Sequence, residues 1–238
     1  YVSVGDGGCA IGNPSACAEL NTNSRRLDIP NGKILLITRN GNVPASNPFV
    51  GMPGSRRCTE PGGVAPNDGP CTETFAFGLR NPFRFAIYPG TNRVYANDVG
   101  QSTSEEIDRI LPGRDYGWNV REGFCLTGST TECTPDPQYT DPLFAYDRST
   151  DCRSITGGAF VPPGLWGPPY EDQYIFADFT CNSVFRLVPQ QDSAWTAEPF
   201  FPADGPVELV FGPGPSGQAL YYLEYFTGEL HRVTGPTV

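Results

Sequence analysis

The sequence is poor in several features that would point to other classes of protein. Its 238 residues include one methionine and one histidine, and 16 basic residues stand against 26 acidic ones, for a formal net charge of −10. No hydrophobic run is long enough to cross a membrane, none resembles a signal peptide, and no long stretch has helical periodicity. The average field repels a phosphate backbone, so we expect no nucleic-acid partner.

What is abundant favours short strands and turns. The chain has 28 glycines, 25 prolines and 12% aromatic residues, which predicts an all-β protein. Its length allows one domain with a sizeable core or two small ones. Eight cysteines are rarely kept as thiols in the cytosol, so we expect an oxidising compartment, and the protein to be secreted, extracellular or periplasmic.

The cysteines are read as structural disulfides, because none has the CxxC spacing of a zinc or redox site. Eight cysteines allow about 105 pairings, and the sequence alone does not decide among them. The short intervening loops suggest three pairs and leave a fourth as the long link: Cys9 with Cys17, Cys58 with Cys71, Cys125 with Cys133, and Cys152 with Cys181.

The stretch from Thr74 to Trp118 predicts a small antiparallel meander. Its strands are Phe83–Ile87, Arg93–Ala96 and Glu106–Ile110, joined by turns rich in glycine and proline. Apolar and polar residues alternate in the last of these strands, as in a half-buried strand.

Further strands are predicted on both sides of this meander, with irregular segments at 39–71 and 119–142. The expected strands are Tyr1–Val4, Gly32–Thr38, Leu143–Tyr146, Ile155–Val161, Tyr174–Phe179, Val184–Val188, Pro199–Phe201, Val207–Phe211, Ala219–Leu223 and Glu229–Val233. Loops as long as the first irregular segment are unusual in compact domains and often functional.

Three segments repeat one pattern: an aromatic strand, an acidic turn, and a strand that ends in a basic and an aliphatic residue. They read RVYANDVGQSTSEEIDRI, QYIFADFTCNSVFRL and ALYYLEYFTGELHRV, and YVSVGDGG with the distant GKILLI fits the same template. The acids of the four turns are Asp6, Asp98, Asp178 and Glu224. A repeat of this kind indicates a β-propeller.

Several motifs in a fixed order resemble a known family. GLRNPFRF is followed by NDVGQ, EEIDRI and DYGW, and SITGGAF and YIFADF come later. This order resembles the glucose/sorbosone dehydrogenases, six-bladed propellers that include soluble aldose sugar dehydrogenases dependent on pyrroloquinoline quinone (PQQ), together with hedgehog-interacting-protein-like secreted relatives. The resemblance implies that residues 1–238 form a single propeller domain, truncated at its N-terminus, that covers roughly the last three to four blades.

The resemblance also implies a cofactor site. The family's matching Arg-Asn pair binds PQQ, which places this role on Arg80 and Asn81, in a turn that leaves a strand. A guanidinium fork suits the carboxylates of PQQ. Without the family, the same residues read as a turn and an ordinary surface cation. Asp6, in its GDGG turn, either contacts the cofactor or only fixes the turn.

Two calcium sites are implied in the same way. Relatives hold one Ca²⁺ with a glutamate carboxylate and a tyrosine backbone carbonyl, which correspond to Glu106 and Tyr116. The other reading is a solvent-facing acid and a core aromatic. A second Ca²⁺ lies against PQQ on backbone carbonyls that match Gly100 and Gln101, although relatives often have Gly-Pro there.

The sequence departs from the enzymes in two respects. Their general-base histidine precedes the segment that matches YVSVGDGG, so we expect it upstream of Tyr1, and we read the lone His231 as a peripheral strand residue. Stretches that supply further cations to PQQ in the enzymes read ADFTCNS and GPVELVFGP here, without Lys or Arg. Four aromatics are candidates for a sugar cleft, although single aromatics are more often core: Trp118, Tyr146, Trp166 and Tyr170.

Two functions therefore stand side by side. The first is PQQ-dependent oxidation of an aldose at C1 to the lactone, with calcium, a sugar substrate and an external electron acceptor. The second is a non-catalytic secreted propeller that binds a protein or glycan. The missing cations favour the second, and the retained Arg80-Asn81 pair and Glu106/Tyr116 pattern favour the first.

Overall fold

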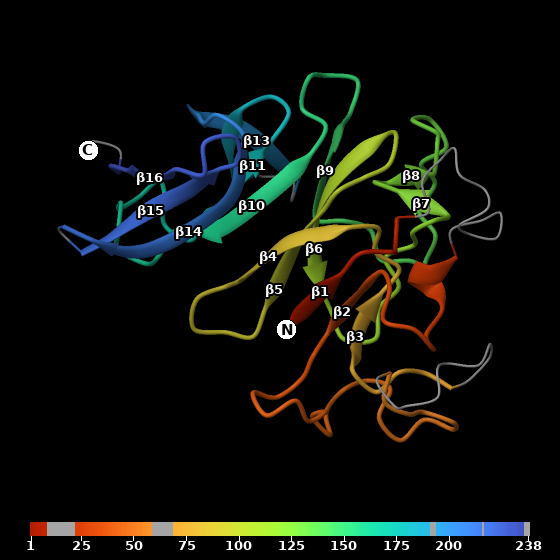
Figure 1. Cartoon of the computed structure of the whole chain (residues 1–238). Coiled ribbons are helices and arrows are strands. Elements are labelled where there is room, and N and C mark those ends of the chain that lie inside the picture. The colour runs from red at the N-terminus through yellow and green to blue at the C-terminus, as the bar shows by residue number, and fades with distance from the viewer. Residues whose placement is uncertain (9–21, 59–68, 191–193, 216, 236–238) are drawn as a thin grey trace. The chain divides into compact units, whose positions relative to one another are not determined.

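The computed structural model describes residues 1–8, 22–58, 69–190, 194–215 and 217–235. The described elements are β-strands apart from one short 3₁₀ helix at Asn23–Arg25 (Figure 1). The chain divides into two compact units. The first unit comprises residues 1–82, 100–103 and 110–142, and the second comprises residues 83–99, 104–109 and 143–238. That the whole chain forms a single propeller domain stays a prediction.

The first unit contains an antiparallel sheet in the order β1-β2-β3. Its strands are β1 (Val2–Val4), β2 (Lys33–Leu35) and β3 (Thr74–Phe77), so the predicted first two strands exist and β2 is shorter than predicted. The 119–142 segment is not wholly irregular, because it holds the small hairpin of β7 (Arg121–Glu122) and β8 (Cys125–Leu126). In the 39–71 segment, the described residues contain no strand, as expected.

The second unit contains three antiparallel sheets whose strands follow one another in chain order: β4-β5-β6-β9, β10-β11-β12-β13 and β14-β15-β16. Each predicted strand is present, with shifted ends. The bounds are β4 Pro82–Ile87, β5 Val94–Asp98, β6 Ser104–Ile110, β9 Phe144–Asp147, β10 Ile155–Phe160, β11 Tyr174–Asp178, β12 Ser183–Pro189, β13 Trp195–Pro202, β14 Pro206–Gly214, β15 Gly217–Glu224 and β16 Leu230–Val233. Repeated sheets of this kind are the blades of a propeller.

Strand β11 shows why these sheets stack. All five of its residues are buried, and alternate side chains enter different clusters. Ile175 and Ala177 join the cluster that includes Leu209 and Leu220 of the sheet β14-β15-β16. Tyr174 and Phe176 join the cluster that includes Ile107 of β6. The middle sheet therefore packs on both faces, which explains an apolar strand with no polar face.

The two glycines of SITGGAF are required by close packing in β10. A Cβ on Gly157 would overlap the backbone of Glu208 and Leu209 in β14, and a Cβ on Gly158 would overlap the hydroxyl of Tyr174. Neither glycine needs a positive φ, so the constraint is space rather than backbone conformation.

The prediction that β6 is a half-buried strand is wrong, because its acidic residues are buried as well. Glu105, Glu106 and Asp108 are all buried, whereas Arg109 is exposed. The reading of Glu106 as a solvent-facing acid is therefore wrong, because its exposed fraction is only 8%. The alternation is real, but in this strand the polar residues also face the interior.

Three predicted disulfides are present: Cys58–Cys71, Cys125–Cys133 and Cys152–Cys181. The predicted pair of Cys9 and Cys17 lies outside the described residues. Disulfides persist in oxidising compartments, so the protein is suited to one. Among the described residues, no helix is long and apolar enough to span a membrane.

The repeated acids occupy equivalent places. Asp98, Asp178 and Glu224 are the last residues of β5, β11 and β15, each the second strand of its sheet, and Asp6 follows β1 by two positions. All four are buried, with exposed fractions of 7% or less. Asp178 shows what such an acid does, since it accepts hydrogen bonds from Ser154 N, Thr180 N and Tyr146 Oη. The repeat seen in the sequence is thus a repeat of a buried carboxylate at a strand end, and Asp6 and Asp178 each accept a hydrogen bond from the backbone of the turn that follows.

Candidate functional site

Arg80 and Asn81 lie in the turn between β3 and β4, as predicted. The Arg80 side chain is half-buried, and its Nε and Nη2 atoms donate to Gln101 Oε1 at 3.0 and 2.7 Å. Its Cζ atom lies 5.7 Å from the ring centroid of Trp118, within cation–π range. The first unit therefore brings together two predicted cofactor residues, one predicted calcium-site residue and an indole.

Asp6 joins the same group of residues. Its backbone N donates to Arg80 O at 2.8 Å, its Oδ2 accepts from Trp118 Nε1 at 2.9 Å, and its Oδ1 accepts from Gly8 N at 2.9 Å. A Cβ on Gly5 would lie 3.3 Å from Asn81 Oδ1, so a glycine lets these turns approach closely. The contacts indicate that Asp6 fixes the turn and the indole beside Arg80.

Glu122 positions the loop that carries Gln101, and the sequence analysis missed it. Glu122 is buried, and its Oε1 accepts from the backbone N atoms of Gln101, Ser102 and Thr103 at 2.6, 2.7 and 2.9 Å. Three backbone donors on one carboxylate oxygen hold the loop in one conformation. Glu122 is distant in sequence from this loop and lies in a segment that the sequence predicted to be irregular, so no local signal marked it.

Lys33 is a second residue that the sequence analysis did not single out. Its ammonium is fully buried and donates to three backbone carbonyls, those of Asn23, Ser24 and Asn31, at 3.2, 2.7 and 2.6 Å. Burial lowers the pKa of Lys33 to about 7, against the opposing field of Asp115 and Asp28. The lysine ties the 22–32 segment to β2 and is not available to a ligand.

Arg80, Gln101, Trp118 and Asp6 form a cluster, here called the Arg80 group, whose chemistry suits a planar anion. A half-buried guanidinium offers bidentate bonds to a carboxylate, and the indole beside it offers an aromatic face. Lys33 is engaged elsewhere, and Arg25 pairs with Asp115 at 3.0 Å. Arg80 is the cation that contacts both Gln101 and Trp118.

The two residues of the predicted calcium site, Glu106 and Tyr116, belong to different units. Tyr116 is buried in the first unit, where its hydroxyl accepts from Leu111 N at 2.9 Å. Glu106 is buried in the second unit. Their joint role as ligands, and that of the Gly100 and Gln101 carbonyls, stays a prediction.

The buried carboxylate of Asp108 shows whether the residues of β6 suit a calcium ion. It lies two residues after Glu106, on the same side of β6; its exposed fraction is 0%, and neither carboxylate oxygen has a hydrogen-bond partner. Burial, with the nearby charge of Asp98, raises its pKa well above the usual range. Buried carboxylate oxygens of this kind suit a hard cation, so the residues present fit Ca²⁺.

The other candidate residues, Trp166, Tyr146 and His231, pack within the core or within a hairpin. Trp166 is buried among Tyr170, Phe200 and Phe211, so it is a core residue. Burial and the adjacent Asp178 raise the pKa of Tyr146, whose hydroxyl donates to that carboxylate. His231 lies in β16, as predicted, and stacks on another ring of the same hairpin.

Comparison with known proteins decides the family. The sequence profile of the Glucose / Sorbosone dehydrogenase family matches residues 1–210, which is most of the chain. The chain belongs to the Glucose / Sorbosone dehydrogenase family. It is 28% identical over 220 residues to the HIPL2 protein of Arabidopsis thaliana, across 84% of this chain and 29% of that protein. It is 30% identical over 214 residues to the aldose sugar dehydrogenase YliI of Escherichia coli, across 87% of this chain and 52% of that protein.

Solved structures agree on the fold of this family member. The apo-form of the soluble aldose sugar dehydrogenase from Escherichia coli matches with a TM-score of 0.68 at 22% identity, across 92% of this chain and 58% of that one. The PQQ-bound form of aldose sugar dehydrogenase from Streptomyces coelicolor matches with a TM-score of 0.58 at 22% identity, across 88% of this chain and 52% of that one. The chain thus spans between 29% and 58% of the length of these relatives.

Proposed function

We propose that the protein takes part in PQQ-dependent oxidation of an aldose at C1 to the lactone. The observation that carries this proposal is the Arg80 group, in which the guanidinium lies 5.7 Å from the Trp118 ring and is held by Gln101. Membership of the Glucose / Sorbosone dehydrogenase family, and the PQQ-bound form of the Streptomyces coelicolor relative, support the same assignment.

This chain's residues have separate parts in the proposal. Arg80 binds a cofactor carboxylate, Asn81 lines the same turn, Trp118 offers the planar face, and Asp6 and Glu122 hold these groups in place. PQQ, if bound, would supply the acceptor for the hydride of the sugar C1, and an external acceptor would take up the electrons. The single histidine, His231, lies in the second unit beside Glu224 at 3.0 Å, so we assign no general base within this chain.

Calcium is the second group that we propose. Glu106 and Asp108 offer carboxylates from one side of β6. The family resemblance implies the Tyr116 carbonyl as a further ligand of the Glu106 site, and the Gly100 and Gln101 carbonyls as ligands of a separate calcium site against PQQ. Oxygen ligands of this type suit Ca²⁺.

One observation favours the alternative, a secreted propeller that binds a protein or a glycan without catalysis. The stretches that match the enzymes' further PQQ-binding cations contain no Lys or Arg here, and the Arg80 Nε and Nη2 atoms already donate to Gln101. A protein that had lost the enzyme activity would keep the fold and the disulfides and lose cations of this kind.

A titration with PQQ in calcium separates the two functions. Tryptophan fluorescence of the chain should be quenched saturably, because Trp118 lies beside Arg80. Arg80→Ala should weaken PQQ binding by about tenfold or more, the loss of a bidentate charged contact. Arg114→Ala, which removes an exposed arginine of the same unit, should bind as the wild type does. The absence of saturable quenching in the wild type would favour the non-catalytic alternative.

A further inference from the structure

The hairpin of β15 and β16 carries a cluster of ligand-type side chains that the proposed function does not use. Glu224, Glu229 and His231 each place one potential ligand atom within 4.8 Å of the others. We propose that this cluster is a binding site for a divalent transition metal, Zn²⁺ in the first place. One imidazole nitrogen and two carboxylate oxygens are ligands that Zn²⁺ takes in proteins, whereas Ca²⁺ and Mg²⁺ prefer oxygen alone.

The distances within the cluster fit such an ion. His231 Nε2 lies 3.0 Å from Glu224 Oε2 and 3.5 Å from Glu229 Oε2. Zinc–nitrogen and zinc–oxygen bonds of about 2.0–2.2 Å at a tetrahedral angle separate two ligand atoms by about 3.3–3.5 Å. The imidazole nitrogen that would bind the metal is therefore the one that already faces both carboxylates, at nearly the required separation.

The hairpin also preorganises the three side chains. Tyr222 and His231 are paired across β15 and β16, and alternation places Glu224 and Glu229 on the same face as these two residues. The Tyr222 and His231 rings stack at 4.5 Å with an interplanar angle of 10°. Glu224 N donates to Glu229 O at 2.9 Å. The imidazole plane and the backbone of both glutamates are thus fixed before any ion binds.

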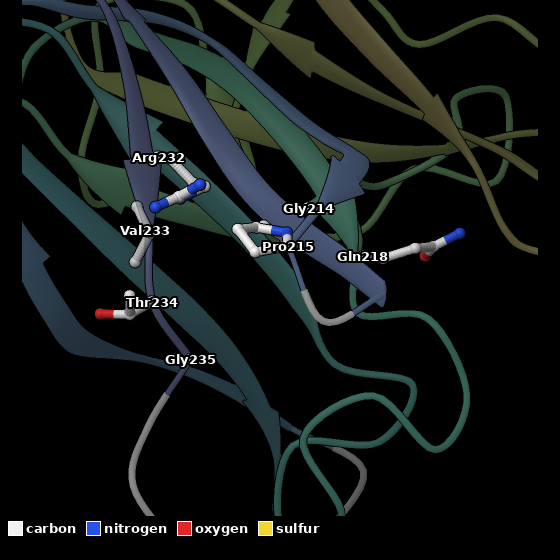
Figure 2. Close-up of a pocket in the computed structure, with 8 residues that line it drawn as sticks. Gly214, Pro215, Gln218, Arg232, Val233, Thr234 and Gly235 are labelled. Atoms are coloured by element: carbon white, nitrogen blue, oxygen red, sulfur yellow. The ribbon is translucent and has the colours of Figure 1, made fainter.

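Two carboxylates and one imidazole share this face. In the described part of the chain, His231 is the ion-pair partner of both Glu224 and Glu229. Burial and then the charges of Glu224, Asp204 and Glu229 raise the pKa of Tyr222. The neighbouring cation, Arg232, lies on the other face, and Figure 2 shows it directed toward Gly214 and Pro215.

A metal ion bound at this site would stabilise the turn between β15 and β16. Glu224 is almost fully buried, whereas the Glu229 side chain is 65% exposed, so the metal would lie at the surface with room for a water as a further ligand. The turn from Tyr225 to Gly228 lies between the first two ligands. A bound ion would therefore tie the last two strands together and stabilise the folded state by mass action.

The test is a calorimetric titration of the whole chain with ZnCl₂ in saturating calcium, which occupies the proposed oxygen sites. We expect one saturable event per chain. His231→Ala and Glu229→Gln should each lower the affinity for Zn²⁺. Because each removes a direct ligand, the loss should exceed the roughly 10- to 100-fold that follows removal of a residue that only supports a ligand. Glu171→Gln, which removes an exposed acid of the same unit, should leave the affinity unchanged.

Two further readouts keep the test independent of any effect of the variants on folding. The chain has a single histidine, so its imidazole NMR signals are unambiguous and should shift with one equivalent of Zn²⁺. Zn²⁺ should also raise the Tm of the wild type and not that of Glu229→Gln, whose exposed side chain is dispensable for folding. No saturable event, or an event of equal affinity in both ligand variants, would overturn the proposal.

Discussion

Replacing Glu122 by alanine should destabilise the protein and, at the same time, weaken the proposed cofactor site. The Glu122 carboxylate accepts from three successive backbone N–H groups and from Ser102 Oγ at 3.1 Å. Those donors belong to the loop from which Gln101 holds Arg80. Loss of the carboxylate should therefore be felt at the guanidinium, although Glu122 itself has no part in binding the cofactor.

The magnitude follows from the number of donors and their exposure. Hydrogen bonds to a charged group contribute about 1.5–3 kcal/mol each, and a buried donor left without an acceptor costs about 1–3 kcal/mol. Ser102 is exposed, so water can replace the acceptor there, whereas Gln101 and Thr103 are half-buried. We expect Glu122→Ala to lower the free energy of unfolding by about 3–5 kcal/mol and Glu122→Gln by about 1–2 kcal/mol, since the amide keeps one acceptor oxygen.

Urea denaturation measures this difference, with Glu132→Ala as the control, because Glu132 is an exposed acid of the same unit. A parallel PQQ titration should show weaker binding for Glu122→Gln at a temperature where that variant is fully folded. If Glu122→Ala were as stable as the wild type, or if Glu122→Gln bound PQQ as tightly as the wild type, the role assigned to this loop would be refuted.

Three further predictions concern buried groups. The pKa of Lys33 in the folded state is lowered to about 7 from 10.5, so between these pH values the unfolded chain binds more protons than the folded one. The free energy of unfolding of the wild type, relative to that of Lys33→Met, should therefore rise with pH in this range, by at most about 1.4 kcal/mol per pH unit. Urea denaturation measures this difference, and a difference that did not change with pH would contradict the prediction. Asp108→Asn should be more stable than the wild type in EDTA yet gain no Tm on addition of Ca²⁺, whereas equal gains would exclude Asp108 as a ligand. Gly158→Ala should cost about 1–3 kcal/mol through overlap with the Tyr174 hydroxyl, while Gly212→Ala, whose Cβ meets only ordinary contacts, should be near neutral.

The strands could be predicted because their local patterns are strong. Alternation, glycine and proline turns and the repeated acid located every sheet of the second unit. Burial of the polar residues in β6 could not be predicted, because alternation says which residues share a side and not whether that side meets solvent or another sheet. The hairpin at β7 and β8 was missed for a related reason, since two-residue strands carry no periodicity.

The site divides in the same way. Arg80, Asn81 and Asp6 were singled out because they lie within short motifs that resemble the family. The structure brings them together in the first unit, and their role in binding a cofactor stays a prediction. Glu122 and Lys33 were missed because their partners are backbone atoms of distant loops, which no sequence spacing encodes. The cluster around His231 was read as an ordinary strand, because only the hairpin register shows that Glu224 and Glu229 share its face.

A crystal structure of the chain grown with PQQ and calcium would test the proposed cofactor site. We expect a PQQ carboxylate on the Arg80 guanidinium, with the ring system beside the Trp118 indole and Asp6 still bound to Trp118 Nε1. PQQ bound at another place, or no PQQ in crystals grown at saturating cofactor, would contradict the assignment of this site.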